Sequence, residues 1–374
     1  MADGSVCHFS FWYDTPLPSP SGFRNFAPLA IEFGERVNIL YGDNGSGKTN
    51  LIEAIFVLCL GRSHRGVPDS VMLQQGTETF RLEGRLSRNG ETEAVAVAYQ
   101  TGGRKKITVE GVPIRPAELY DRFCAVTAGP EDTELLAGSP AARRVFLDIY
   151  LAQYSPRYIA QLSDYSRALA QKNAALRMNA APEAFNAVLV PLGAAITAAR
   201  ARFLEQLVPL AAGHYERISH GSKMTIAYRA SAASVTDSNG AEGMAAQYER
   251  KLASYTERER AMQVSLVGPH RDDLAIEIGG YPARTHASQG EMRTAAIALK
   301  LAVYQLLAAR RGALPLLLLD EIFAELDDRR IGALLAELAE FQQLFLTTAG
   351  QPPSALQAQS RRFEISGGRI AGVQ

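Results

Sequence analysis

The sequence lacks an excess of charge of either sign and has no long apolar run. Lys and Arg together number 39, as do Asp and Glu, so the formal net charge is zero. No overall basic character therefore marks a nucleic-acid-binding protein, and any DNA site must be local. No stretch approaches the roughly 18 consecutive apolar residues of a membrane span, and no secretory signal pattern opens the chain. We expect a cytoplasmic protein with no membrane partner.

Cysteine is also scarce. The three cysteines, Cys7, Cys59 and Cys124, are odd in number and widely spaced. They lack the paired spacing of a zinc site, so we expect free thiols in a reducing compartment. With 374 residues, of which 47% are hydrophobic, the chain is long enough to bury the core of one large domain or of two.

A phosphate-binding loop is the strongest motif present. Residues 42–49, GDNGSGKT, match the pattern G-x-x-x-x-G-K-[ST] in full, between a predicted strand at 35–42 and a predicted helix at 48–61. Small residues let backbone N–H groups curve around phosphate oxygens, and the helix adds the positive end of its dipole. Lys48 is expected to reach the β and γ phosphates, and Thr49 to ligate Mg²⁺. The alternative, a glycine-rich turn that matches by chance, is disfavoured by the flanking elements.

Two acids follow an apolar run that predicts a buried strand. In LLLLDE, residues 316–321, four leucines indicate a strand covered on both faces. Asp320 is the expected second contact to Mg²⁺, and Glu321 is expected to orient or deprotonate an attacking water. Alone, the two acids would indicate a loop start or a helix cap. The complete phosphate loop favours the catalytic interpretation.

The remaining pattern divides the chain into a head and an inserted arm. Short β-like runs between Gly-containing turns predict an antiparallel meander over 79–114, and residues 5–13 alternate like an edge strand. Residues from about 140 to 262 contain long stretches with helical periodicity. We predict an α/β fold, a phosphate-loop ATPase head of the ATP-binding-cassette (ABC) type with a mixed sheet and an antiparallel meander, formed by residues 1–140 and 263–374, with a helical arm at 141–262. Further predicted elements are a hairpin at 273–285, helices at 288–310 and 328–341, strands at 314–321 and 343–350, and a hairpin at 361–373.

A second short motif, SQGE at 288–291, opens the helix predicted at 288–310. By itself it predicts a capping box between Ser288 and Glu291. The phosphate loop, SQGE, LLLLDE and AELD (324–327) stand in the order found in ABC ATPases. That resemblance implies that Ser288, Gln289 and Gly290 contact ATP held by a second copy of the chain, and that Asp327 lies at the dimer seam.

Along nearly its whole length the chain resembles the RecF family of bacterial recombination mediators. Stretches specific to that family include GRSHR (61–65) and GPHRDDL (268–274), and FRNF (23–26) also matches. The resemblance implies an ATP-dependent homodimer of the nucleoid-associated cytoplasm. It also implies slow Mg²⁺-dependent ATP hydrolysis, binding of double-stranded DNA beside single-strand gaps, and cooperation with RecO and RecR to load recombinase during replication, repair and the response to DNA damage.

The candidate site residues fall into four groups. ATP is expected to contact Gly42, Asp43, Asn44, Gly45, Ser46, Gly47, Lys48, Thr49 and Asn50, with Ser288, Gln289 and Gly290 from the second copy. Lys48 and Glu321 are the catalytic candidates, and Thr49 and Asp320 the metal ligands. DNA contacts are assigned to Arg62, Arg65, Arg104, Lys105 and Lys106. For residues 104–106 a solvated turn is the alternative; for GRSHR the alternative is an internal role near ATP. His270, Arg271 and Asp272 predict a buried ion-pair network between arm and core, with a direct catalytic role as the alternative.

Two features depart from the cassette pattern. Many cassette transporters place a histidine after the strand that follows the acidic pair, whereas this chain has Thr347 and Thr348, which can donate hydrogen bonds but cannot act as bases. No clear glutamine loop is found, and Glu131 or Asp132 is its expected substitute. Rival functions are the ATPase subunit of another cassette system such as a transporter, a structural DNA clamp with vestigial hydrolysis, and a phosphate-loop kinase.

Overall fold

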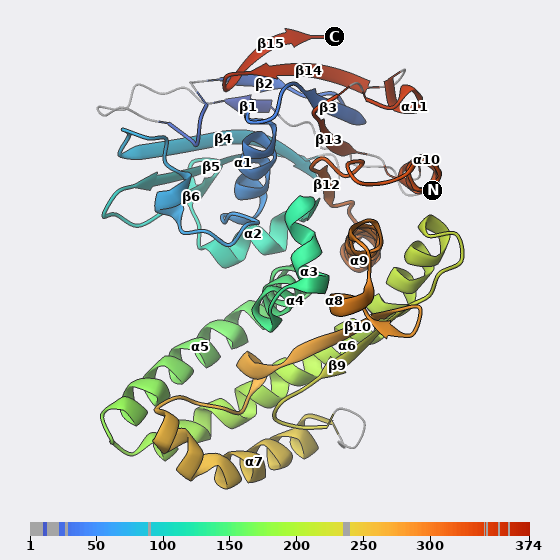
Figure 1. Ribbon diagram of the computed structural model, residues 1–374. Coiled ribbons are helices and arrows are strands. Elements are labelled where there is room, and N and C mark those ends of the chain that lie inside the picture. The colour runs from blue at the N-terminus through green and yellow to red at the C-terminus, as the bar shows by residue number, and fades with distance from the viewer. Residues whose placement is uncertain are drawn as a thin grey trace. The chain divides into compact units, whose positions relative to one another are not determined.

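The computed structural model describes residues 10–12, 22–26, 29–88, 91–234, 240–339, 341, 343–350, 352–357 and 360–374 (Figure 1). Its contacts divide the chain into two compact units. Unit 1 comprises Met1–Asp132, Arg217–His220 and Ala296–Gln374, and unit 2 comprises Thr133–Glu216 and Gly221–Ala295. The boundaries of the predicted head, 1–140 and 263–374, and of the predicted arm, 141–262, stay a prediction.

The core of unit 1 is a six-stranded sheet with the order β15-β14-β3-β13-β12-β8. Its strands are β3 (Val37–Tyr41), β8 (Ala125–Ala128), β12 (Leu316–Leu319), β13 (Leu344–Thr348), β14 (Ser360–Ser366) and β15 (Arg369–Val373). All run parallel except β15, which pairs antiparallel at one edge. The four leucines of β12 are buried, as a parallel strand covered on both faces requires. The carboxyl ends of the parallel strands meet at one edge, where ligands bind in open α/β sheets.

A second six-stranded sheet in unit 1 is antiparallel throughout, with the order β2-β1-β4-β5-β6-β7. Its strands are β1 (Ser10–Trp12), β2 (Ala30–Glu32), β4 (Thr79–Arg88), β5 (Glu91–Gln100), β6 (Lys106–Val109) and β7 (Val112–Pro113). The predicted meander is confirmed. The predicted edge position of 5–13 is wrong for β1, because β2 pairs beside it and takes the edge; residues 5–9 and 13 lie outside the described residues.

Helix α1 (Lys48–Leu60) packs against both sheets of unit 1, with contacts to β4, β5, β8, β12 and β13. Its residues from Leu51 to Leu60 are all buried, as expected of a helix that is apolar on every side. Gly61 ends it in the left-handed conformation, with φ 67°. This burial fixes the helix N-terminus, and with it Lys48 and Thr49, at the carboxyl edge of the sheet. The other helices of unit 1 include α2 (Pro116–Arg122), α10 (Asp328–Leu338) and α11 (Ser354–Gln357).

Two helical segments, Pro182–Ile218 and Gln289–Arg311, are long and apolar enough to cross a membrane by length and composition. Within the protein, 50% of the first apolar window and 83% of the second are buried. The second segment is α9, which begins in unit 2 and ends in unit 1. Its apolar surface is that of a core helix.

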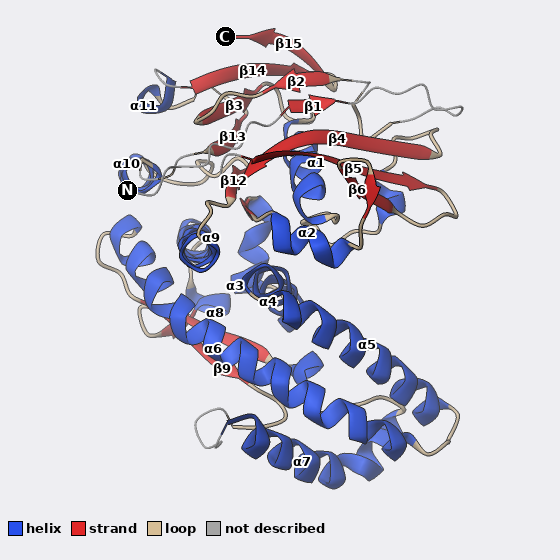
Figure 2. Cartoon of the chain, turned by 180° about the vertical axis from the view of Figure 1, so that it is seen from behind, coloured by secondary structure: helices blue, strands red, loops and turns tan. Residues whose placement is uncertain are grey.

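Unit 2 is mainly helical and also contains a small sheet, whose order is β11-β10-β9 (Figure 2). The helices are α3 (Glu134–Ala137), α4 (Pro140–Tyr154), α5 (Pro156–Arg177), α6 (Asn186–Ile218), α7 (Gly240–Met262) and α8 (Ala283–His286); the strands are β9 (Met224–Arg229), β10 (Asp273–Ile278) and β11 (Tyr281–Pro282). The predicted hairpin is confirmed in β10 and β11. Strand β9, inside the predicted helical arm, was not predicted, because this six-residue strand is set by pairing with β10, far along the chain.

A buried ion-pair network lies at the centre of unit 2. Arg200, on α6, donates hydrogen bonds to Asp148 at 2.8 Å and to Asp272 at 3.2 Å. The Asp272 carboxylate also accepts from the Ser231 N–H at 2.7 Å and from the Tyr228 hydroxyl. Burial raises the pKa of Asp272, and the Arg200 charge with these donors opposes that rise. The predicted network is confirmed for Asp272, which joins residues of the predicted head and arm.

His270 and Arg271 take a different part from Asp272. The His270 ring is within hydrogen-bond distance of the Tyr165 hydroxyl at 2.7 Å and of the Ser265 carbonyl at 3.1 Å. Burial lowers the pKa of His270 to about 4, which keeps the ring neutral at pH 7. Arg271 also donates to the Ser265 carbonyl. These two residues order the turn before β10.

Replacing Arg200 should destabilise unit 2 strongly. In Arg200→Met, the buried Asp272 and the half-buried Asp148 lose their common cation, which costs on the order of 3–5 kcal/mol in the free energy of unfolding. Arg167→Met is the matched control, since the Arg167–Asp164 pair is exposed and such pairs contribute about 0–1 kcal/mol. Denaturant unfolding followed by circular dichroism measures both changes, and equal losses in the two variants would contradict the assignment of the network.

Candidate active site

The phosphate loop connects the end of β3 to the start of α1. Gly42, Gly45 and Gly47 have φ values of 143°, 80° and 116°, a region that favours glycine. A Cβ added at Gly42 would lie only 2.2 Å from the Ile365 carbonyl oxygen. Residues 43–45 are exposed, whereas 46–48 are buried. The sequence therefore produces a loop that is anchored at one end and presents its tip to solvent.

The Lys48 side chain bonds back to the start of the phosphate loop. Its Nζ donates hydrogen bonds to the backbone carbonyls of Gly42 at 2.7 Å and Asp43 at 2.9 Å. The same Nζ lies 3.5 Å from a carboxylate oxygen of Glu321. The ammonium thus lies between the phosphate loop and the acidic end of β12. These two segments are far apart in sequence, and the fold brings them together. That is where a phosphate oxygen would find a positive charge.

Asp320 follows the last leucine of β12 and is nearly fully buried. Its carboxylate accepts a hydrogen bond from the Thr347 hydroxyl at 2.5 Å and is hydrogen-bonded to Thr49. Burial raises the pKa of Asp320, the two hydroxyls oppose that rise, and the charges of Glu131 and Glu321 add to it. A cation bound here would relieve the cost of that buried negative charge.

The donor set fits Mg²⁺. Thr49 and Asp320 offer oxygen atoms, and Mg²⁺ is commonly held by one or two carboxylates together with substrate phosphates and water. Within the described residues, no group of three or more His, Cys, Asp and Glu side chains is arranged to hold a metal ion. The predicted pair of ligands therefore suits a metal that arrives with a nucleotide better than a metal bound by protein alone.

Glu321 has a strained backbone at the point where catalysis was predicted. Its φ of 46° lies in the left-handed region, which costs a non-glycine residue on the order of 1–3 kcal/mol and persists only where the surroundings impose it. The Glu321 N–H donates to the Thr347 hydroxyl oxygen at 2.9 Å. Thr347 therefore accepts from one acidic residue and donates to the other. Thr347, expected as a hydrogen-bond donor after the acidic pair, orients the Asp320 carboxylate and holds the Glu321 backbone.

The segment after β8 adds a further charged group beside the site. His64 lies 3.2 Å and Arg65 3.6 Å from the Glu131 carboxylate. Burial by itself raises the pKa of Glu131, but the hydrogen bond and charge of His64, with the charge of Arg65, outweigh it and hold the pKa at about 2. Glu131 therefore stays ionised near Asp320. That Glu131 or Asp132 takes the place of a glutamine loop stays a prediction.

A buried lysine connects α9 to the same segment. Lys300 Nζ lies 2.7 Å from the Asp132 carboxylate and donates to the Thr127 carbonyl at 2.8 Å. Asp132 also accepts from the Gly129 N–H at 2.9 Å, and the Asp320 N–H donates to the Ala128 carbonyl at 2.7 Å. Helix α9, strand β8 and the acidic end of β12 are thereby fixed to one another in unit 1. Sequence reasoning missed β8 and Lys300; the signal for β8 was the short apolar run before Gly129-Pro130.

The SQGE turn belongs to unit 2. Ser288 and Glu291 form the predicted capping box: the Ser288 N–H and hydroxyl each donate to the Glu291 carboxylate at 2.8 Å, and the Glu291 N–H donates to the Ser288 hydroxyl at 3.3 Å. Ser288 and Gln289 are exposed, and Gly290 is half-buried. Asp327 is exposed and caps α10, accepting from the Arg330 N–H at 2.9 Å. The structure brings together Lys48, Thr49, Asp320 and Glu321 in unit 1, but assigns SQGE to the other unit.

The candidate DNA-binding residues have different surroundings. Arg62 interacts with Tyr120, and Arg65 with Glu131, contacts that favour the internal alternative for GRSHR. Lys105 pairs with Asp69 at 2.8 Å. Arg104 and Lys106 are exposed at the end of the β5–β6 turn.

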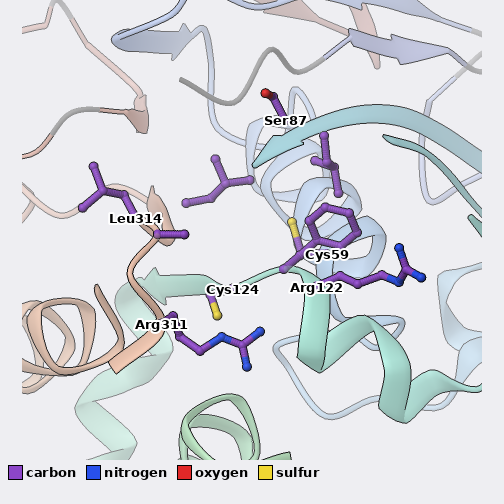
Figure 3. Close-up of a pocket in the computed structure, with 10 residues that line it drawn as sticks. Cys59, Ser87, Arg122, Cys124, Arg311 and Leu314 are labelled. Atoms are coloured by element: carbon purple, nitrogen blue, oxygen red, sulfur yellow. The ribbon is translucent and has the colours of Figure 1, made fainter. Parts of the chain in front are cut away.

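A small cavity lies at the opposite end of α1 from the phosphate loop, about 16 Å along the helix axis. Its volume is about 20 Å³, enough for about one water molecule. Cys59 and Cys124 line it with Arg122 and Arg311 (Figure 3). Both cysteines are free thiols, as predicted; Cys7 lies outside the described residues. Both arginines are engaged, Arg122 with Glu93 and Arg311 with the Asp121 carbonyl.

Comparison with known proteins identifies the family of this chain. The profile of the RecF/RecN/SMC N terminal domain family matches residues 20–361. The DNA replication and repair protein RecF of Symbiobacterium thermophilum is 38% identical, over 87% of this chain and 88% of the relative. RecF of Moorella thermoacetica is 37% identical, over 93% of each.

A solved structure of the recombination mediator RecF with ATP, described as part of the RecFOR pathway, superposes with a TM-score of 0.88. It is 30% identical, and the match covers 99% of this chain and 98% of that one. The predicted fold class, with a mixed sheet, an antiparallel meander and a helical insertion, is confirmed. The chain belongs to the RecF family of DNA replication and repair proteins.

Proposed function

We propose that this chain is an ATP-binding recombination mediator that hydrolyses ATP slowly and closes as a homodimer on double-stranded DNA beside single-strand gaps. The observation that carries the proposal is the meeting of Lys48, Thr49, Asp320 and Glu321 in unit 1 of a RecF-family chain. Support for ATP as ligand comes from the related solved structure, which is described as RecF with ATP.

Each of these residues has a separate role in the proposed hydrolysis of ATP. Backbone N–H groups of the loop and the Lys48 ammonium bind the phosphates, because their positive ends face the same edge of the sheet. Thr49 and Asp320 would hold Mg²⁺, which would supply positive charge to balance the charge that develops on the phosphates. Glu321, fixed by Thr347, orients the attacking water and accepts its proton. The Lys48 ammonium is hydrogen-bonded to the loop carbonyls and lies beside Glu321.

The proposed dimer explains why the SQGE turn is exposed. Ser288, Gln289 and Gly290 stand at the N-terminus of α9, a 23-residue helix, where the helix dipole favours an anion. They would contact ATP bound by the partner subunit, and Asp327 would lie at the seam. In this scheme residues 1–140 and 263–374 act as the ATPase head, and 141–262 as the arm.

DNA, RecO and RecR are the proposed partners, by membership of the RecFOR pathway named for the related structure. The proteins of this family serve DNA replication and repair, so the chain acts inside the cell, and we propose a nucleoid-associated location in the cytoplasm. Arg104 and Lys106 are the exposed candidates for phosphate contacts, whereas Arg62, Arg65 and Lys105 each have a protein partner. The competing proposal is a DNA clamp with vestigial hydrolysis.

Glu321→Gln should separate hydrolysis from binding. Loss of a general base lowers kcat by about 100-fold or more, while the affinity for ATP stays within about twofold, because the amide keeps the shape and size of the side chain. Glu205→Gln, at an exposed position of α6, is the matched control and should hydrolyse ATP at the unaltered rate. ATP turnover and equilibrium binding of a fluorescent ATP analogue give the two quantities. Unchanged turnover in Glu321→Gln would favour vestigial hydrolysis.

The composite site predicts turnover per chain that rises with protein concentration. Ser288→Arg and Lys48→Ala should each abolish it, and an equimolar mixture should regain about a quarter of the wild-type rate, since half of the dimers are mixed and each of these holds one intact site. Ser163→Arg, at an exposed position of α5, is the control. A specific activity that is independent of concentration, together with a mixture that stays inactive, would rule out the composite dimer.

A further inference from the structure

The C-terminal hairpin touches the phosphate loop. One pocket, of about 320 Å³, is lined by Gly42, Asp43, Asn44, Gly45 and Ser46 on one side and by Glu364, Ile365, Ser366 and Gly367 on the other. This contact follows from the sheet, because β14 runs parallel to β3 and both end at the same edge. The turn between β14 and β15 therefore lies beside the loop that follows β3, although more than 300 residues separate them (366 minus 46).

Gly368 joins the two segments by a backbone hydrogen bond. Its N–H donates a hydrogen bond to the Ser46 carbonyl at 2.9 Å. Its φ is 71°, and a Cβ added there would lie 2.1 Å from the carbonyl oxygen and 2.9 Å from the carbonyl carbon of Asn25. Both are backbone atoms, which cannot turn aside as a side chain can. Only glycine allows the hairpin to reach the loop.

Asn25 supports the same carbonyl from a third segment. Its Nδ2 donates to the Ser46 carbonyl at 3.4 Å, and its Oδ1 accepts from Asn50 Nδ2 at 2.9 Å. A Cβ on Gly47 would lie 2.9 Å from the Asn25 side chain. The Ser46 carbonyl is thus held by two donors. In a planar trans peptide the N–H of Gly47 points away from that carbonyl, so the two donors also fix the direction of a loop N–H group.

The Ser46 hydroxyl is a buried group of the phosphate loop that a bound ligand would satisfy. Its Oγ is buried and, within the described part of the chain, has no hydrogen-bond partner; Ser46 is 7% exposed. A buried hydroxyl without a partner costs about 1–3 kcal/mol. An acceptor such as a phosphate oxygen would remove that cost.

We propose that Gly368 and the turn Ser366–Gly368 are positioning elements of the nucleotide site, which hold the peptide unit between Ser46 and Gly47 in the form that binds phosphate. The inference rests on the proposed function, since it assumes that the loop binds a nucleotide. Gly368 touches no substrate itself. It acts through the loop, so its effect falls on the phosphate part of the nucleotide and not on the base.

The test compares binding of ATP and of inorganic tripolyphosphate, with Mg²⁺, to the full-length chain. Gly368→Ala should weaken both about tenfold or more, and Asn25→Ala both about threefold. The matched control, Gly372→Ala, lies in the same hairpin, where a Cβ would meet the Glu364 side chain at an ordinary 3.4 Å, and it should bind both within twofold of wild type. Circular dichroism and thermal melting report the fold of each variant.

Equal affinities of folded Gly368→Ala and wild type would overturn the proposal, as would a loss for ATP without a loss for tripolyphosphate. If Gly368→Ala does not fold, Asn25→Ala decides by the same two comparisons, because removing its amide creates no clash. A wild-type chain that binds neither probe would overturn the proposed function as well, and this result differs from every outcome in which wild type binds and only the variants change.

Discussion

The active site depends on one hydroxyl group between two acids. Thr347 donates to the Asp320 carboxylate and accepts from the Glu321 N–H, so β13 orients the Asp320 carboxylate and holds the backbone of Glu321 at the end of β12. Burial disfavours the charged form of Asp320. The left-handed backbone conformation of Glu321 is strained. Both residues are held in place by a parallel sheet in which β12 is buried throughout and β13 is buried up to Thr347.

Around that centre, the site is assembled from segments that are remote in sequence. Strand β3 and α1 supply the phosphate loop, β12 the acids and β13 the hydroxyl, while β8 and α9 meet through Lys300 and Asp132. The C-terminal hairpin supports the loop from outside through Gly368. A parallel sheet makes this possible, because it gathers the carboxyl ends of separate strands at one edge.

Sequence reasoning was most accurate where a local pattern carries its own physical cause. The phosphate loop, the leucine strand and the capping box at Ser288 depend on neighbours within a few residues, and all three elements formed where they were predicted. It failed for short strands. Strand β8 has four residues and β9 has six, and each is defined by a distant partner. The edge position of β1 failed similarly, because β2 pairs beside it.

The sequence by itself determined which chemistry is available, since a phosphate loop, two acids after an apolar strand and a serine-capped helix each require particular residues at fixed spacing. Only the tertiary structure decided which residues meet. The contacts of Thr347 with the acids, of Lys300 with Asp132, and of Gly368 with Ser46 join residues between 26 and more than 300 positions apart. Such contacts follow from sheet order and close backbone approach, which no local pattern encodes.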